Sequence, residues 1–135
     1  MIVLSNTITQ TLAPGQSLTF NTVVLHTGCA ECYRTGSGSV GLRANNGIYE
    51  IAFHANISSA TAAVPVQLAV QMDGAPLSET TMISTPSTAN VFNNVGCETK
   101  VSTCCCTGGA ITVSNTGTAP VTIAANPCLS IKRVA

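Results

Sequence analysis

The residues in this sequence best suited to chemistry are its cysteines, seven in 135 residues. Cys29 and Cys32 are separated by two residues, which is the spacing at which two thiolates bind one metal ion. The remaining cysteines are Cys97, Cys104, Cys105, Cys106 and Cys128. Because seven is an odd number, they cannot all pair as disulfides within one chain.

The pair and the triplet allow three interpretations. Cys29 and Cys32 with two cysteines of 104–106 would supply four thiolates for a tetrahedral zinc ion, if loops 28–38 and 103–109 meet at one end of the fold. Disulfides formed after release from the cell would connect the same loops. Free thiols are the third interpretation, because cysteine also packs as a small hydrophobic residue. Apart from this zinc ion, the sequence predicts no cofactor.

The other reactive side chains do not form a catalytic pattern. They are two histidines and five carboxylates: His26, His54, Glu31, Glu50, Asp73, Glu79 and Glu98. A Ser/His/Asp triad needs three converging groups, and nothing in the spacing of these residues supports one. No nucleophile elbow, phosphate-binding loop or dinucleotide fingerprint is present. We therefore expect a protein that is not an enzyme.

Ligand recognition would need exposed aromatic or polar loop residues. Tyr33 is the one aromatic residue in an expected loop, and it stands next to Arg34. These two residues are the candidates for contact with a ligand, although packing within the loop explains Tyr33 equally well. Carboxylates are too scarce to predict a calcium site.

Short β-strands must position these residues. The clearest covers residues 47–57, where the odd positions from Tyr49 onward are apolar and the even positions are small or polar, as in a half-buried strand. Asp73-Gly74 is the turn of a tight hairpin. Residues 28–38 read as a Gly/Ser loop. Further strands are expected at 17–25, 64–72, 77–83, 90–101, 110–114 and 120–134, the last interrupted at Pro127.

This pattern predicts a single all-β domain over residues 1–135, a two-sheet antiparallel sandwich of jelly-roll type. Residues 1–16 would be an N-terminal arm or a first edge strand. The first six residues lack the basic region and the long apolar stretch of a secretory signal, so we expect synthesis in the cytoplasm. A run of about 18 apolar residues, which would indicate a membrane span, is also absent.

Charged side chains make up only 7% of the sequence, against about 25% in an average soluble domain. The five basic residues form no stripe that could neutralise phosphates, which argues against nucleic-acid binding. A hydrophobic content of 45% excludes a disordered chain. We expect so uncharged a domain to cover part of its surface with copies of itself.

Three short motifs resemble those of complement-q and tumour-necrosis-factor-like jelly-roll domains. Residues 47–54 (GIYEIAFH) resemble the Gly-x-Tyr-x-Phe strand of these domains, with Ile51 and then Phe53 after Tyr49. The alternation of Val66 to Gly74 and the closing Leu129-Ser130-Ile131 follow in the same order. The resemblance spans residues 17–134 and is greatest for small bacterial and phage versions, such as the terminal domain of exosporium collagen-like proteins. The collagen-like stalk common in the family is absent.

The resemblance implies a homotrimer in which one sheet of each subunit faces a three-fold axis. The even face of strand 47–57 would then contact neighbours, with Glu50, Ala52 and His54 at the interface. We expect the second face of strand 64–72 to form such a seam too. Glu50 would be the one charge there that needs a partner, and the other charges would lie mostly in solvated loops, turns and terminal residues. Three copies of His54 could bind a metal or an anion; a hydrogen-bonded or exposed histidine at the seam is the alternative.

The biological setting implied by the resemblance is the outside of a particle. The first hypothesis is a structural trimer, a head-fibre or decoration component of a phage virion, with capsid proteins as partners. The alternative is an adhesin-like head on a bacterial cell or spore surface, which binds a glycan or a host protein through its Cys-rich loops. Neither hypothesis involves nucleic acid or a membrane.

Overall fold

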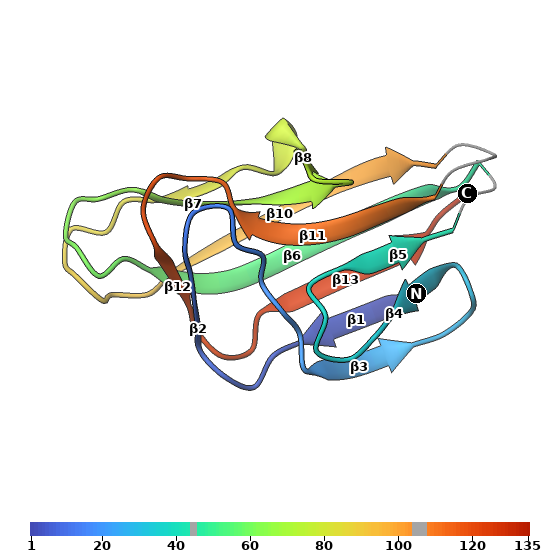
Figure 1. The fold of residues 1–135 in the computed structure, drawn as a ribbon, viewed down its shortest axis with the longest axis horizontal. Coiled ribbons are helices and arrows are strands. Elements are labelled where there is room, and N and C mark those ends of the chain that lie inside the picture. Colours follow the sequence, from blue (N-terminus) through green and yellow to red (C-terminus); the bar gives the residue numbers. More distant parts are fainter. Residues whose placement is uncertain (44–45, 104–107) are drawn as a thin grey trace.

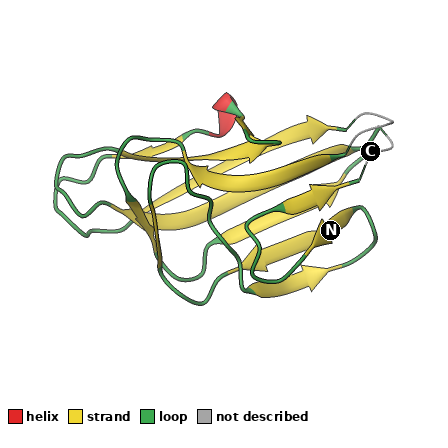
Figure 2. Cartoon of the chain, in the orientation of Figure 1, coloured by secondary structure: helices red, strands yellow, loops and turns green. Residues whose placement is uncertain are grey.

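The computed structural model describes residues 1–43, 46–103 and 108–135, which form two antiparallel β-sheets packed face to face (Figure 1). Strands and loops dominate, with a single short helical turn among the described residues (Figure 2). This arrangement confirms the expected two-sheet antiparallel sandwich. No helix in the described part of the chain is long and apolar enough to cross a membrane.

The first sheet has seven strands. They are β1 (Ile2–Ser5), β2 (Gln10–Leu12), β3 (Thr22–His26), β6 (Ile48–Ser58), β10 (Asn93–Ser102), β12 (Val121–Ile123) and β13 (Cys128–Arg133). Their order is β2-β12-β6-β13-β1-β3, and β10 pairs with the other edge of β6. The longest strand, β6, is therefore hydrogen-bonded on both sides, by β10 on one side and by β13 and β12 on the other.

The second sheet has six strands. They are β4 (Glu31–Tyr33), β5 (Val40–Leu42), β7 (Val66–Met72), β8 (Ala75–Pro76), β9 (Met82–Ser84) and β11 (Gly109–Asn115). Their order is β4-β5-β11-β7-β8, and β9 also pairs with β7. The turn between β7 and β8 is the expected Asp73-Gly74, where both residues have positive φ, 54° and 83°. Glycine adopts this conformation without steric cost.

The core lies between the two sheets, and β6 supplies its centre. The odd residues Tyr49, Ile51, Phe53, Ala55 and Ile57 are all buried, as the alternation predicted. Val66, Leu68 and Val70 of β7 are buried from the facing sheet. The even residues of β6 from Ile48 to Asn56 point away from the core and are half-buried or exposed in one chain, whereas Ser58 at the end of the strand is buried.

The position of β7 corrects one expectation. Because β6 belongs to the seven-stranded sheet and β7 to the six-stranded sheet, their outer faces point to opposite sides of the sandwich. The outer faces of β6 and β7 therefore cannot both form the interface between subunits around one three-fold axis. The even face of β6 remains the candidate.

The sequence placed three further elements imprecisely. The strand expected at 17–25 begins only at Thr22, because Ser17 bridges to Ser114 of the six-stranded sheet and the chain then crosses to pair with β1. The expected loop 28–38 contains β4, whose three residues are too few to show an alternation. Of residues 1–16, β2 is at a sheet edge, whereas β1 lies inside the sheet between β13 and β3.

The strand expected at 77–83 is interrupted by a helical turn, η1 (Ser78–Thr80). The cause is the buried Thr80 side chain. Its hydroxyl accepts a hydrogen bond from the Val70 amide at 2.9 Å and lies 2.7 Å from the Leu77 carbonyl oxygen, to which it donates. The Thr80 hydroxyl thus serves as the hydrogen-bond acceptor that a backbone carbonyl of a neighbouring strand would otherwise provide for the Val70 amide of β7.

Replacing Thr80 by valine should lower the free energy of unfolding by about 1–3 kcal/mol, because the Val70 amide loses a buried acceptor while the side-chain shape is kept. Urea unfolding followed by circular dichroism measures this loss. Thr81→Val is the matched control, since Thr81 is exposed. An unchanged midpoint for Thr80→Val would show that the amide finds another acceptor.

Candidate interaction surface and cysteine-bearing end

The outer face of the seven-stranded sheet is built from four rows of residues that cross β10, β6 and β13. The register places Lys100, Glu50 and Lys132 in the first row and Glu98, Ala52 and Ser130 in the second. Gly96, His54 and Cys128 form the third row, and Asn94 and Asn56 the fourth. We call these eleven residues the outer face.

The first row is an ion-pair network. Lys100 Nζ lies 3.5 Å from Glu50 Oε2, and Lys132 Nζ lies 3.4 Å from Glu50 Oε1. Both lysines are exposed, so each pair contributes at most about 1 kcal/mol to stability. Glu50, the one charge expected to need a partner at this interface, is thus paired within its own chain.

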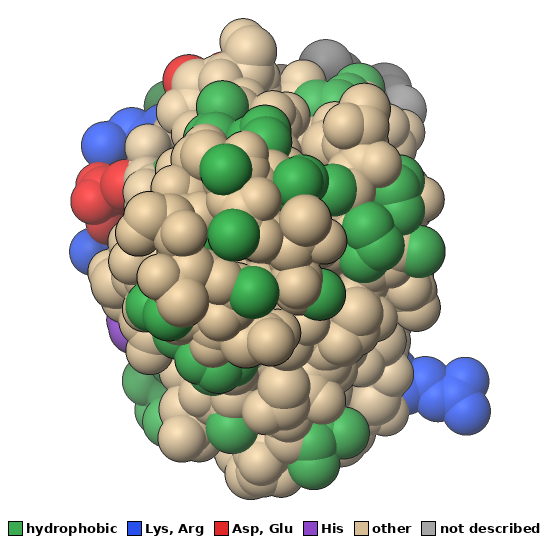
Figure 3. Space-filling view, turned by 90° about the vertical axis from the view of Figure 1, so that its left-hand side faces the viewer, with side chains coloured by type: hydrophobic (Ala, Val, Ile, Leu, Met, Phe, Trp, Pro, Cys, Tyr) green, Lys and Arg blue, Asp and Glu red, His purple; other side chains and the backbone are tan. Residues whose placement is uncertain are grey.

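The charge distribution on this face also differs from expectation. Glu98, Lys100 and Lys132 lie on strands of the outer face, whereas we expected the charges other than Glu50 mostly in loops, turns and terminal residues. They lie in its first two rows. In Figure 3 charged side chains gather at the left margin, where the seven-stranded sheet lies. Charge is therefore concentrated in one part of the outer face instead of being absent from it.

The remaining rows are small or polar. Ala52 and Ser130 are half-buried within one chain, and Gly96 has no side chain. In the fourth row the Asn94 amide donates to Asn56 Oδ1 at 3.2 Å. Apart from Glu98, a second molecule could cover these rows without burying a charge, which is what an interface core requires.

The end of the sandwich that carries Cys29 and Cys32 is held together by backbone contacts. The Arg43 amide donates to the Ala30 carbonyl at 3.0 Å, and the Thr103 hydroxyl donates to the Arg43 carbonyl at 3.0 Å. Cys29 and Cys32 flank this region, and both are exposed and unpaired among the described residues. The residues on which the zinc and disulfide interpretations also depend, Cys104, Cys105 and Cys106, lie outside the described residues. Thr103, which precedes this triplet in the sequence, is connected to Ala30 by the two hydrogen bonds that the Arg43 backbone makes.

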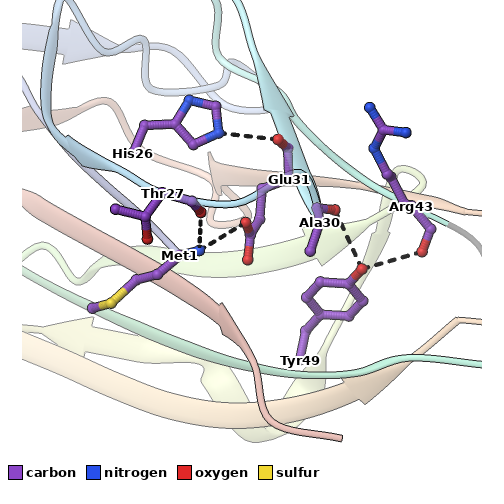
Figure 4. A network of polar contacts seen from close by, with 7 residues as sticks. All are labelled: Met1, His26, Thr27, Ala30, Glu31, Arg43 and Tyr49. Atoms are coloured by element: carbon purple, nitrogen blue, oxygen red, sulfur yellow. Dashed lines mark hydrogen bonds and ion pairs between the residues drawn. The ribbon is translucent and has the colours of Figure 1, made fainter.

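Glu31 is buried beside these cysteines, whereas we expected it in a solvated loop. Its side chain is 0% exposed, and Oε2 lies 3.0 Å from the Met1 amino nitrogen (Figure 4). The Met1 amino group also donates to the Thr27 carbonyl at 2.7 Å, and the His26 ring lies 3.1 Å from the Glu31 carbonyl oxygen. Glu31 Oε1 is buried and has no hydrogen-bond partner among the described residues. This network is not predictable from the sequence, because Met1 reaches the other members only through the β1–β3 pairing.

The two ligand-loop candidates differ in their surroundings. The Tyr33 hydroxyl donates to the carbonyls of Phe20 and Ser37, the latter at 2.9 Å. Burial raises the pKa of Tyr33, and these contacts close the 33–37 turn. They support the packing interpretation of Tyr33 over a ligand contact. Arg34 is exposed.

The thiols should differ in reactivity in reduced, metal-free protein. Burial raises the pKa of the Cys97 and Cys128 thiols, which lowers their thiolate fraction at pH 8. Burial also shields both sulfur atoms from the reagent. Cys29 and Cys32 are exposed. We expect iodoacetamide to label them at least about tenfold faster than Cys97, as measured by peptide mass mapping. Equal rates in the folded protein would contradict this, and equal rates in denaturant are the control.

No pocket opens on the described surface. No three His, Cys, Asp or Glu side chains of one chain come together there as a metal site. What the described surface does offer is a flat sheet face and an end bearing two exposed cysteines.

Comparison with solved structures finds proteins that share this architecture. No family model and no curated protein sequence matches the chain. The globular domain of zebrafish complement 1qA protein superposes with a TM-score of 0.71 at 12% identity, over 99% of this chain and 96% of that one. Murine APRIL, in its crystal structure at pH 8.0, superposes with a TM-score of 0.64 at 14% identity, over 98% of this chain and 97% of that one. Such low identities show a shared fold alone. The chain therefore has the jelly-roll fold of complement-q and tumour-necrosis-factor-like domains, which the sequence motifs had suggested.

Proposed function

We propose that this chain is a non-enzymatic structural domain that assembles as a homotrimer through its outer face. The observation that carries the proposal is the composition of that face. Apart from Glu98, its middle rows are small and polar, and its charged row is already paired, so association buries little other unpaired charge. The fold adds support, because a trimer is what the resemblance to complement-q and tumour-necrosis-factor-like domains implies.

The first proposed setting is the surface of a phage virion, where the trimer decorates the capsid or forms a head fibre. This setting draws support from the end of the sandwich opposite the cysteines. The loops there, residues 59–65, 85–92 and 116–120, contain no charged residue. Figure 3 views this end and shows hydrophobic and neutral side chains across it. Val91 and Phe92 are exposed there, Phe92 by 45%. Such an end is suited to anchoring on another protein.

The second candidate role is an adhesin-like head on a bacterial cell or spore. The observation that favours it is the segment 29–34, in which Cys29, Cys32 and Arg34 lie close together in sequence and are all exposed. A glycan array distinguishes the two roles. Binding that is lost in Arg34→Ala favours the adhesin, whereas co-purification with capsid protein favours decoration.

The trimer itself is tested by size-exclusion chromatography with light scattering. One chain weighs 13.7 kDa, so the expected mass is about 41 kDa, three times that value. A mass of 13.7 kDa across micromolar concentrations would reject the proposal. A dimer would also reject it, because a two-fold interface is a different assembly.

A further inference from the structure

The third row of the outer face places a histidine beside a cysteine. His54 of β6 stands directly opposite Cys128 of β13 and opposite Gly96 of β10. Directly opposed residues of antiparallel strands share a face, with Cβ atoms about 4.5–5.5 Å apart. The imidazole and the thiol are therefore neighbours. On the other flank of His54, Gly96 contributes no side chain that could cover the ring.

The described structure gives neither side chain another role. Neither has a hydrogen-bond or ion-pair partner among the described residues. The other histidine, His26, is instead within hydrogen-bonding distance of the Glu31 carbonyl, and Cys97 packs against the core. His54 is exposed and Cys128 half-buried, so both are within reach of a molecule that covers the outer face.

We propose that each chain contributes His54 and Cys128 to a transition-metal site that is completed by other copies of the chain, with Zn²⁺ as the expected class of ion. This inference rests on the proposed trimer. Imidazole nitrogen and thiolate sulfur are the ligands that zinc prefers, and a zinc site takes about four. One described chain brings no third such ligand to the pair. Outer faces turned toward a common axis would bring three pairs together.

Binding requires each Cys128 that coordinates the metal to lose its proton, which passes to the solvent. Burial raises the pKa of this thiol, so the free chain holds it protonated and a metal must favour the thiolate. The pair is distinct from the zinc site considered for Cys29, Cys32 and the 104–106 triplet, since it lies on the sheet face and not at the sandwich end.

The test uses the full chain with Cys29, Cys32, Cys104, Cys105 and Cys106 changed to serine, which removes the other candidate ligands. We expect about one Zn²⁺ per three chains by elemental analysis, and a thiolate-to-metal absorption band in the near ultraviolet with Co²⁺. His54→Ala and Cys128→Ser should each lower the bound metal at least tenfold. Cys97→Ser and His26→Ala are the matched controls and should leave it unchanged.

Retention of the metal in both His54→Ala and Cys128→Ser would overturn the site, and so would one ion per single chain, because no other copy would then be needed. If the serine background does not fold by circular dichroism, the same comparison is made in the native chain, where Cys128→Ser and His54→Ala should remove one ion per trimer.

Light scattering with and without chelator separates this inference from the proposed function. A trimer that persists in chelator and binds no zinc rejects the metal site and keeps the trimer. A trimer that forms only with zinc supports both. A monomer under both conditions rejects the trimer and the shared site with it.

Discussion

Ala52→Glu should convert the proposed trimer to a monomer. Ala52 is half-buried at the centre of the outer face, between Glu98 of β10 and Ser130 of β13. A glutamate there would place a second carboxylate about 5 Å from Glu98 at the level of Cβ. A neighbouring chain would bury both without a partner, and like charges buried together at an interface cost several kcal/mol. Each 1.4 kcal/mol weakens association about tenfold.

The measurement is the light-scattering mass of the variant over a concentration series, and we expect dissociation at concentrations at least about 100-fold above those needed for wild type. Ile83→Glu is the matched control. Ile83 is 59% exposed on β9, so the same charge is added to the six-stranded sheet, and this variant should remain trimeric. If Ala52→Glu stays a trimer while Ile83→Glu dissociates, the six-stranded sheet is the interface instead.

The sequence predicted the centre of the fold because β6 is long. Eleven residues give several full alternations, and its odd positions fill the core as expected. The three-residue strands β4 and β5 show no alternation that could be recognised. The segment 17–25 predicts one strand because most of its residues are apolar or β-branched. Its change from one sheet to the other is set by partners about 97 residues away, such as Ser114.

The placement of charges was harder to predict than the core. Lys100 and Lys132 meet Glu50 only because β10 and β13 pair with opposite edges of β6 in one register. A shift of one residue would move each lysine to the core face. Glu31 illustrates the same limit. A carboxylate in a Gly/Ser-rich stretch suggests a solvated loop, and its burial depends on a strand pairing that brings Met1 beside it. Low overall charge therefore indicated association, but not which residues would be buried.

Replacing Tyr49 by alanine should cost about 3–5 kcal/mol of stability, the range for deleting a large aromatic from a core. Tyr49 is 0% exposed and is among the largest fully buried side chains. Its ring occupies space that Gly47 leaves free, since a Cβ on Gly47 would lie 2.9 Å from Tyr49 Cε2. This contact is a physical reason for the Gly-x-Tyr pattern that the sequence displays.

The hydroxyl of Tyr49 contributes separately. It donates to the carbonyls of Ala30 and Arg43, at 3.2 and 3.3 Å (Figure 4). Ala30 also accepts from the Arg43 amide, and Arg43 from the Thr103 hydroxyl. Because each carbonyl keeps one donor, Tyr49→Phe should cost only about 0.5–1.5 kcal/mol.

Urea unfolding of Tyr49→Phe, Tyr49→Leu and Tyr49→Ala separates the contribution of packing from that of hydrogen bonding. If Tyr49→Ala does not fold, Tyr49→Leu still measures the loss of the aromatic ring. We expect the loss to grow in that order, because each step removes more buried apolar volume while the hydroxyl is absent from all three. Equal losses in phenylalanine and alanine would mean that the hydroxyl, and not the ring, holds this end of the sandwich together. In that case the backbone contacts around Ala30, which position Cys29 and Cys32, would depend on a single phenol.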